Sequence, residues 1–171
     1  ELEGLIVRAE QGEPIQYIIC YVDFRGLEIR CDRRALIPRP ETELVVDLVL
    51  ARVAPGSAPA ILDLGTGSGA LAVTLALEVP AAQVTAVDFS ASALDVARAN
   101  AAALAASVRF VESDWFAALD TAAGFDFIVS NPPYIAEGDP HLAALRHEPQ
   151  SALTAGPDGL RDLRAIIHEA G

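Results

Sequence analysis

Short apolar runs alternate with longer helical patterns between residues 60 and 130. Each run is rich in valine, isoleucine, leucine or phenylalanine and ends beside glycine, aspartate or asparagine, which is typical of a buried strand. The longer segments carry apolar residues at helical intervals. We therefore predict strands over residues 60–64, 83–87, 108–112 and 125–130, with helices over 70–78 and 92–104. This alternation predicts an α/β domain in which helices cover the faces of a parallel sheet.

The pattern outside this region predicts smaller elements. Before residue 60, the predicted elements are a helix over residues 2–11, a β-hairpin formed by 18–24 and 27–31, and a helix over 42–53. After residue 130, we predict mostly loop, with a short helix near residues 141–146 and a last helix over 160–169.

Charge and composition narrow the classes of ligand. The chain has 12 basic and 24 acidic residues, a net charge of −12, and 52% hydrophobic residues. Lysine and arginine supply most of the affinity for a phosphate backbone, so this balance favours a protein or small-molecule substrate over nucleic acid. The printed sequence contains no run of 18 apolar residues, so we expect no membrane partner.

The two cysteines, Cys20 and Cys31, fall in predicted strands and lack the spacing of metal ligands. We expect buried, reduced thiols and no metal site, which fits a cytoplasmic location. The first residue is Glu1 rather than methionine, so we expect the natural protein to begin earlier.

A glycine-rich turn follows the first strand of the alternation. Asp63 precedes Gly65-Thr66-Gly67-Ser68-Gly69, where glycines let a ligand approach the backbone and the next helix offers unpaired N–H groups. The spacing Gly65-x-Gly67-x-x-Ala70 also fits the dinucleotide fingerprint. Asp88 ends the second strand and can accept hydrogen bonds from both ribose hydroxyls of either kind of cofactor. The turn alone therefore leaves the cofactor open.

The tetrapeptide Asn131-Pro132-Pro133-Tyr134 follows the strand predicted over residues 125–130. The prolines have no backbone N–H, so the strand ends there, and their fixed φ stiffens the turn. The side-chain oxygen of Asn131 and the carbonyl of Pro132 can accept both N–H bonds of a planar nitrogen, in a carboxamide or on a base ring. The nitrogen lone pair would then face an incoming methyl group, with the ring of Tyr134 stacked on a flat substrate. The tetrapeptide therefore indicates methylation of such a nitrogen.

Two features favour a sulfonium cofactor over a nicotinamide cofactor. Asp63 can attract the ammonium group of a cationic ligand, and a nicotinamide enzyme has no evident use for the acceptors at Asn131. Trp115 ends the third strand beside Asp114, and two roles stay open for its ring, contact with adenine and packing in the core. Arg39 lies between two prolines, and two roles also stay open for it, a local salt bridge and a lining residue of the substrate mouth.

Several stretches together resemble the peptide chain release factor glutamine methyltransferase family. They are Gly12-Glu13-Pro14 with Tyr17, Phe24-Arg25-Gly26, Leu36 to Glu43, Asp63 to Gly69, Ser113 to Phe116, and Ser130 to Tyr134. The resemblance covers nearly the whole chain. Residues 37–43 are the more specific marker, because enzymes that methylate adenine or guanine share the tetrapeptide.

The resemblance implies S-adenosylmethionine as cofactor and methylation of the side-chain nitrogen of the glutamine in the Gly-Gly-Gln loop of release factors. It also implies a seven-stranded Rossmann-like sheet in three layers, the class I methyltransferase architecture. By position, residues Gly65 to Gly69, Asp88, Trp115 and Asn131 would bind the cofactor. Residues Asn131 to Tyr134 would bind the glutamine, with Asn131 and Pro132 as the catalytic acceptors.

The sequence departs from this family in two respects. Cys20 stands where the family usually has glycine before the hairpin. The family also has a helical N-terminal domain that grips the release factor and three strands after the fourth, and we expect neither to be complete here. We therefore expect residues 1–16 to be the tail of that domain, 17–36 a linking hairpin, and 37–171 a methyltransferase domain whose fourth strand is left at an open edge.

Three functions compete at this point. The first is a glutamine methyltransferase acting on release factors, and the second is an amino-group methyltransferase acting on adenine or guanine in DNA or RNA. The third is a nucleotide-binding module without transfer activity. The net charge of −12 and the lack of a basic cluster argue against the second, and the acceptors of the tetrapeptide argue against the third.

Overall fold

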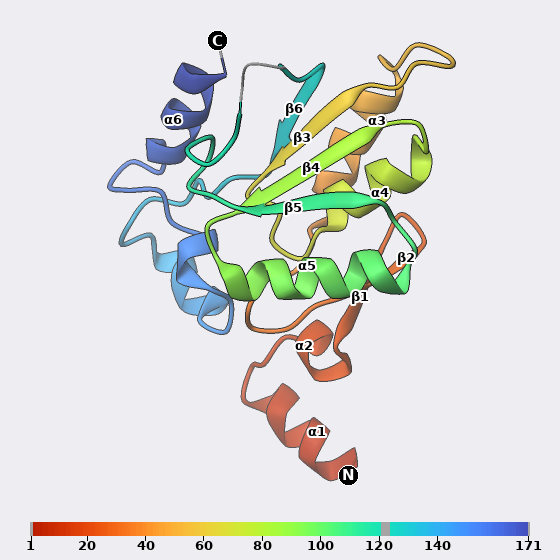
Figure 1. Ribbon diagram of the computed structural model, residues 1–171. Coiled ribbons are helices and arrows are strands. Elements are labelled where there is room, and N and C mark those ends of the chain that lie inside the picture. Colours follow the sequence, from red (N-terminus) through yellow and green to blue (C-terminus); the bar gives the residue numbers. More distant parts are fainter. Residues whose placement is uncertain (1, 121–123, 171) are drawn as a thin grey trace.

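The computed structural model describes residues 2–120 and 124–170 (Figure 1). Its centre is a parallel sheet with the strand order β5-β4-β3-β6. The strands are β3 (Ala60–Leu64), β4 (Gln83–Asp88), β5 (Val108–Glu112) and β6 (Phe127–Ser130). Helix α4 (Ala70–Glu78) connects β3 to β4, and α5 (Ala91–Ala103) connects β4 to β5. The predicted α/β class with a parallel sheet is therefore confirmed, and β6 lies at one edge of the sheet that the described residues form.

Side chains of β3 alternate between two hydrophobic clusters, because successive residues of a strand point to opposite faces. Ile61 packs in a cluster that includes α4 and α3 (Glu43–Leu50). Leu62 and Leu64 pack in a second cluster, which Ile166 of α6 (Arg161–Glu169) joins. These three β3 side chains are fully buried. Helices therefore cover both faces of the sheet, as the sequence predicts.

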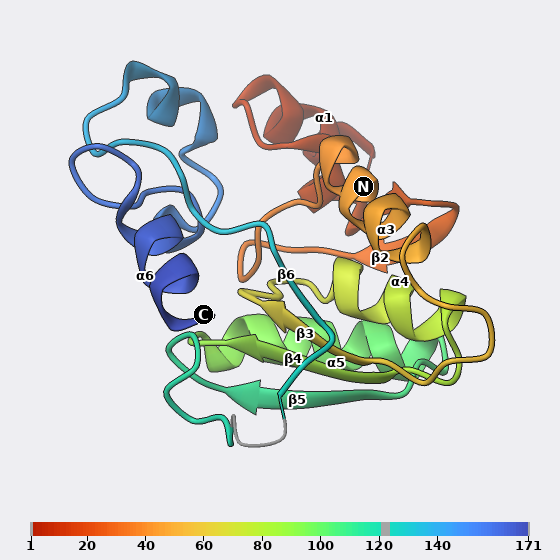
Figure 2. The same ribbon diagram turned by 90° about the horizontal axis from the view of Figure 1, so that it is seen from above.

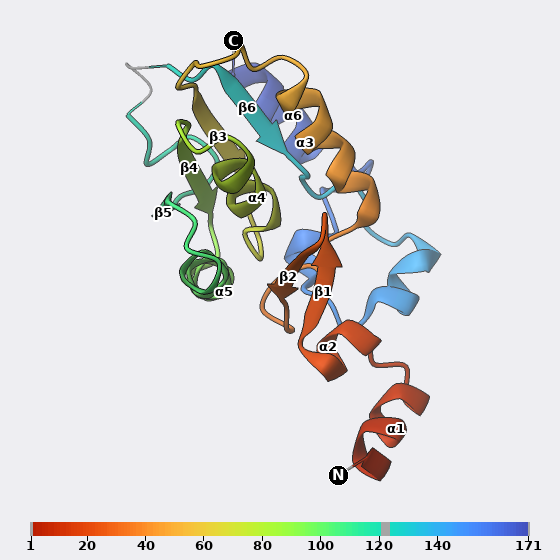
Figure 3. The ribbon, with the colours of Figure 1, turned by 90° about the vertical axis from the view of Figure 1, so that its right-hand side faces the viewer.

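The N-terminal region contains a helix that the sequence analysis did not predict. The elements there are α1 (Leu2–Glu10), α2 (Ile15–Ile19), β1 (Tyr21–Phe24) and β2 (Leu27–Arg30). The two strands form the predicted hairpin, but the prediction of a strand from residue 18 was wrong. Residues 17 and 18 instead belong to α2, where they are its buried residues, and Pro14 precedes this helix. Helices α1 and α2 extend away from the sheet beyond the hairpin (Figure 3).

Cys20 lies at the turn between α2 and β1, in the left-handed conformation with a φ of 67°. Its thiol is exposed, whereas Cys31 is buried, and both are free. The prediction that both cysteines lie in strands was wrong, because Cys20 caps α2 and Cys31 follows β2. The prediction of a buried thiol is confirmed for Cys31 alone. Burial raises the pKa of the Cys31 thiol to about 12.

The segment that follows β6 packs against the N-terminal region. It contains the 3-10 helices η3 (Pro140–Leu145) and η4 (Gln150–Ala152), so the short helix predicted near residues 141–146 is a 3-10 helix. Ile135 and Thr154 form an isolated parallel bridge. Arg146 donates a hydrogen bond to the carbonyl of Gln11, which places this segment beside the end of α1 (Figure 2).

We predict that Cys20→Gly stabilises the protein. A side chain in the left-handed region costs about 1 kcal/mol that glycine does not, so the free energy of unfolding should rise by about that amount. Ala99→Gly is the matched control, because Ala99 is exposed within α5 and glycine in a helix costs about 1 kcal/mol. Urea denaturation of the three proteins measures both changes. Equal destabilisation by the two substitutions would show that residue 20 does not need glycine's freedom.

Candidate functional site

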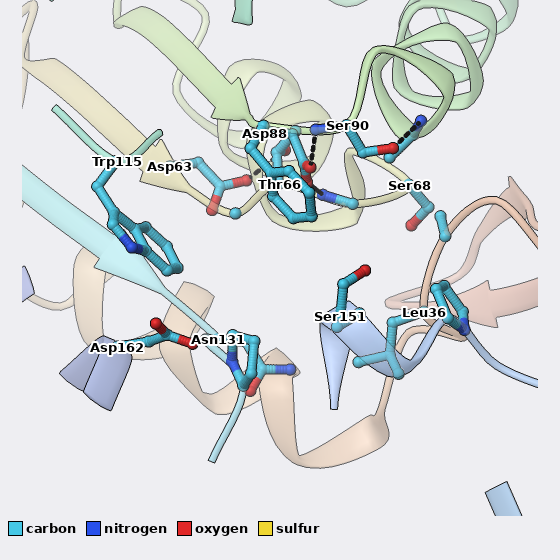
Figure 4. A pocket seen from close by; sticks show the side chains of 18 of the residues that line it. Leu36, Asp63, Thr66, Ser68, Asp88, Ser90, Trp115, Asn131, Ser151 and Asp162 are labelled. Atoms are coloured by element: carbon cyan, nitrogen blue, oxygen red, sulfur yellow. Dashed lines mark hydrogen bonds between the residues drawn. The ribbon is translucent and has the colours of Figure 1, made fainter. Parts of the chain in front are cut away.

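The carboxyl ends of the four strands open into one cavity of about 1060 Å³. The loops after β3, β4, β5 and β6 each contribute to its wall, and so do residues 33–38, residues 149–154 and α6. Figure 4 shows Asp63, Thr66 and Asp88 on one side of this cavity, facing Asn131, Asp162 and Ser151 on the other. Ligands of open α/β sheets bind at this edge, so the cavity is the candidate active site.

Two hydrogen bonds hold the glycine turn after β3, one to the neighbouring strand β4 and one within the turn. The N–H of Thr66 donates to the carbonyl of Val87 over 2.8 Å, and the N–H of Gly69 donates to the carbonyl of Thr66 over 2.9 Å. Gly65 has a φ of 69°, and a Cβ there would lie 3.4 Å from the ring of Trp115. Side chains at this position would therefore be strained and would crowd the tryptophan that lines the cavity.

Gly69 has a different role from the other glycines of the turn. It does not line the cavity, and a Cβ there would lie 3.0 Å from the Cβ of Ala97 in α5. Its φ is 83° at the start of α4. Gly69 therefore allows α4 and α5 to pack closely, which is a structural reason for the third glycine of the motif.

Asp63 is a buried carboxylate with one free oxygen. The hydroxyl of Thr66 donates to Oδ2 over 2.6 Å, while the buried Oδ1 has no hydrogen-bond partner among the described residues. Burial raises the pKa of Asp63 to about 7, an effect that the Thr66 hydrogen bond partly opposes. A buried acceptor without a partner costs free energy, and Asp63 lines the cavity, so its carboxylate is suited to a cationic or hydrogen-bond-donating group there.

Backbone N–H groups orient the carboxylate of Asp88. Oδ2 accepts from Gly67 over 2.8 Å, and Oδ1 accepts from Ser90 over 2.9 Å. Burial raises its pKa, and these two hydrogen bonds partly counter the shift. Each carboxylate oxygen has a second lone pair, so Asp88 can still accept two hydroxyl groups from the cavity. The glycine turn and this acid are therefore one hydrogen-bonded unit.

Trp115 packs in the core and also lines the cavity. Its ring is partly buried in the second hydrophobic cluster, lies over Gly65 and lines the cavity. The backbone at Trp115 has a φ of 45°, and the hydroxyl of Ser113 donates to its carbonyl over 2.9 Å. The indole is thus a fixed flat wall of the site.

Asn131 lies where two cavities meet. It lines the large cavity with Pro133, and it lines a second cavity of about 280 Å³ with Pro132 and Tyr134. The Nδ2 of Asn131 donates to Oγ1 of Thr42 over 3.2 Å. Tyr134 is 62% exposed, so its ring stands at the surface. Every predicted site residue except Gly69 therefore lines one of the two cavities.

Arg39 and Glu148 form an ion pair that the sequence did not reveal. Arg39 Nη2 lies 2.6 Å from Glu148 Oε1, and the N–H of Ile37 donates to Glu148 Oε2 over 3.1 Å. Arg39 also lines the second cavity. It therefore makes a salt bridge, although not a local one, and it lines the second cavity. Glu148 follows a histidine in a polar loop, a context that gives no sequence signal.

Asn100 is a second residue that the sequence analysis missed. Its amide, 1% exposed in α5, donates to the carbonyls of Arg30 and Ser68 over 2.9 and 2.8 Å and accepts from the N–H of Arg30 over 2.9 Å. The side chain thereby joins the hairpin to the glycine turn. A buried polar residue in an otherwise apolar helix face was the available signal.

Acidic and basic groups both face the large cavity. The remaining charged residues of its wall are Arg33, Arg34, Asp114, Arg161, Asp162 and Glu169. Asp162 is buried and pairs with Arg161. No group of three or more potential metal ligands occurs in the part of the chain that the structure describes. No helix among the described residues is long and apolar enough to cross a membrane.

The sequence and the fold both resemble known methyltransferases. The sequence model of the family called Methyltransferase small domain matches residues 42–154. A protein of Burkholderia pseudomallei named "Release factor glutamine methyltransferase" is 50% identical over 96% of this chain and 60% of its own length. A protein of Vibrio cholerae with the same name is 45% identical over 99% of this chain and 60% of its own. The chain thus spans about three fifths of the length of these relatives.

Solved structures of methyltransferases are also similar to this chain. A T. thermophilus 16S rRNA N2 G1207 methyltransferase, in complex with AdoMet and guanosine, is 28% identical with a TM-score of 0.56 over 69% of this chain and 33% of that one. The hMettl16 catalytic domain, in complex with the MAT2A 3'UTR hairpin 1, is 18% identical with a TM-score of 0.67 over 91% of this chain and 60% of that one. The second likeness extends to the fold alone.

Proposed function

Because this chain belongs to the methyltransferase small domain family, we propose that it binds S-adenosylmethionine and transfers the methyl group to a glutamine side chain. The proposed glutamine is that of the Gly-Gly-Gln loop of peptide chain release factors, which fits a cytoplasmic protein. The observation that carries this proposal is the position of Asn131, at the junction of a large and a small cavity. Relatives of known name at 45 to 50% identity support the choice of substrate.

The large cavity has groups that fit each part of the cofactor. The unpartnered Oδ1 of Asp63 suits the ammonium of the methionine portion, and Asp88 suits the ribose hydroxyls. The backbone of residues 65–68 suits close approach by the ligand, and Trp115 suits the flat adenine. When bound, S-adenosylmethionine supplies an electrophilic methyl group on a positively charged sulfur.

The second cavity suits the substrate amide. Asn131 and Pro132 both line it, so the side-chain oxygen of the first and the carbonyl of the second can accept the two N–H bonds of a carboxamide. An amide nitrogen held in this way keeps its lone pair directed at the large cavity. No general base is then needed before transfer, because positive charge that develops on the nitrogen strengthens both hydrogen bonds.

The alternative substrate is an amino group on adenine or guanine. Asn131 and Pro132 would accept its two N–H bonds equally well, and one similar solved structure is an rRNA methyltransferase in complex with guanosine. The net charge of −12 disfavours binding to a polyanion. The names of the more similar relatives also favour the release factor.

We predict that Asn131→Ala lowers kcat more than it lowers cofactor affinity. The substitution removes an acceptor that acts most strongly when the substrate nitrogen becomes positive, a loss of about 3 kcal/mol or roughly a hundredfold in rate. Asn131→Asp keeps an acceptor and should retain partial activity. The measurement is steady-state methylation of a release factor by the full-length protein, with the affinity for S-adenosylhomocysteine measured by calorimetry. Methylation by Asn131→Ala at the wild-type rate would refute the assignment of this site.

We predict that cofactor affinity depends on the ionisation of Asp63. Only the ionised carboxylate pairs with an ammonium, and its pKa is raised to about 7. The affinity for S-adenosylhomocysteine should therefore rise with pH up to about 7 and level off above it, with a slope approaching about tenfold per pH unit well below pH 7.

Two variants separate this effect from general titration of the protein. Asp63→Asn should bind more weakly at pH 8 and lose the dependence near pH 7. Asp95→Asn is the control, because Asp95 is exposed in α5 and pairs with Arg98, and it should keep the wild-type profile. An unchanged profile in Asp63→Asn, or tighter binding of NAD than of S-adenosylhomocysteine, would contradict the proposed cofactor site.

A further inference from the structure

Residues 36–42 form a strap that crosses both cavities. Leu36 lines both of them, Pro38 and Thr42 line the large one, and Arg39 lines the small one. Pro38 and Pro40 fix φ at two of its positions. The strap ends in η1 (Pro40–Thr42), where the N–H of Thr42 donates to the carbonyl of Arg39 over 3.0 Å. The backbone of the strap therefore has few accessible conformations between the cavities and α3.

The carboxylate of Glu148 holds this strap in place, although Glu148 lies 109 positions after Arg39 in the sequence. The Glu148 side chain is 3% exposed, and its two oxygens accept from different points of the strap, the N–H of Ile37 and the guanidinium of Arg39. A buried carboxylate with both oxygens engaged resists displacement, because either partner would be left unpaired. The clamp thus holds the strap in one position relative to the residues after β6.

Thr42, the last residue of the strap, contacts the side chain of Asn131. Thr42 Oγ1 lies 3.2 Å from Asn131 Nδ2, although the two residues are 89 positions apart. An asparagine amide has a donor end and an acceptor end. When Nδ2 is engaged by Thr42, Oδ1 is the end that remains for a group in the cavities.

We propose that Thr42 is a positioning residue, which holds the Asn131 amide with its oxygen toward the substrate N–H. This inference rests on the proposed methyl transfer to a carboxamide. Thr42 acts through Asn131, since its hydroxyl is the acceptor for Nδ2. Without the Thr42 hydroxyl, the Asn131 amide has an unpaired Nδ2 when its oxygen faces the substrate. The amide can then rotate, so that Nδ2, a donor, faces a substrate N–H that needs an acceptor.

The test uses Thr42→Val, which has nearly the same shape without the hydroxyl, and Thr42→Ser, which keeps the hydroxyl. In the full-length protein, Thr42→Val should lower kcat for release factor methylation roughly fivefold to tenfold, the worth of about one neutral hydrogen bond. The affinity for S-adenosylhomocysteine and the melting temperature should stay close to wild type. Thr42→Ser should restore most of the rate.

Thr74→Val is the matched control. Thr74 is buried in α4, and its hydroxyl has no hydrogen-bond partner among the described residues. The same change of threonine to valine at this position should leave kcat unchanged. If Thr42→Val and Thr74→Val both lowered kcat, the cause would be altered packing, and the positioning role of Thr42 would be overturned.

A double-mutant cycle identifies the residue through which Thr42 acts. In the Asn131→Ala background, Thr42→Val should cause no further loss of rate, because the amide that it positions is gone. An equal loss in both backgrounds would place the effect of Thr42 elsewhere. Wild-type kcat in Thr42→Val would also overturn the inference while leaving the proposed function intact.

An NMR measurement tests the contact without reference to activity. The side-chain amide signals of Asn131 in 15N-labelled protein should shift and exchange faster in Thr42→Val, and should stay near their wild-type positions in Thr42→Ser. Unchanged signals in Thr42→Val would overturn the inference. Failure of the wild-type protein to methylate a release factor would instead refute the proposed function, and these signals would still decide whether Thr42 holds the amide.

Discussion

The common direction of the four strands is the constraint on which the site depends. In a parallel sheet all carboxyl ends lie at one edge, and the register brings Leu64 beside Val87 on one side and beside Ser130 on the other. The loops that follow these residues therefore start next to one another. Asp88 and Asn131 face the same cavity for this reason, although the sequence separates them widely.

The opposite wall of the cavity is built by residues outside the central βαβ pattern. The strap is clamped by Glu148, and Asn100 joins Arg30 to the glycine turn. These hydrogen bonds tie the strap to the residues after β6 and the hairpin to the glycine turn, and each would leave a polar group unpaired if it broke. Residues 33–38 and α6 line the cavity although the family match is confined to residues 42–154. The geometry of the site therefore depends on segments that flank the matched domain.

Local pattern predicted the bounds of several elements of the central sheet and its helices. β3, α4 and β5 have the predicted bounds. β3 is almost continuously buried, whereas β5 exposes Arg109 and Glu112 but still carries the strand-forming residues Val108, Phe110 and Val111. The pattern failed at residues 15–19, where isoleucine and tyrosine suit a strand and a buried helix face equally. β6 begins at Phe127 rather than Phe125. Asp126, just before it, bonds to Ala60 through both its backbone N–H and its carboxylate.

Sequence motifs predicted residues that line the candidate site but not the residues that hold them in place. Strand ends and glycines are local signals, so the turn at 65–69 and the tetrapeptide at 131–134 could be found from spacing. Thr42, Asn100 and Glu148 act on partners 89, 70 and 109 positions away. No local pattern carries such information. Gly69 fits the motif, but the structure explains it by close packing against Ala97. The spacing of the glycines cannot distinguish such packing from contact with a ligand.

The central claim is that the acceptors at Asn131 and Pro132 hold the side-chain nitrogen of a release factor glutamine for methyl transfer. It is tested most directly by mass spectrometry of a release factor after incubation with the full-length protein and isotopically labelled S-adenosylmethionine, with duplex DNA and ribosomal RNA in parallel reactions. The account predicts one labelled methyl group on the glutamine of the Gly-Gly-Gln loop, and no label when that glutamine is replaced by alanine. Label on adenine or guanine amino groups, with an unmodified release factor, would contradict it.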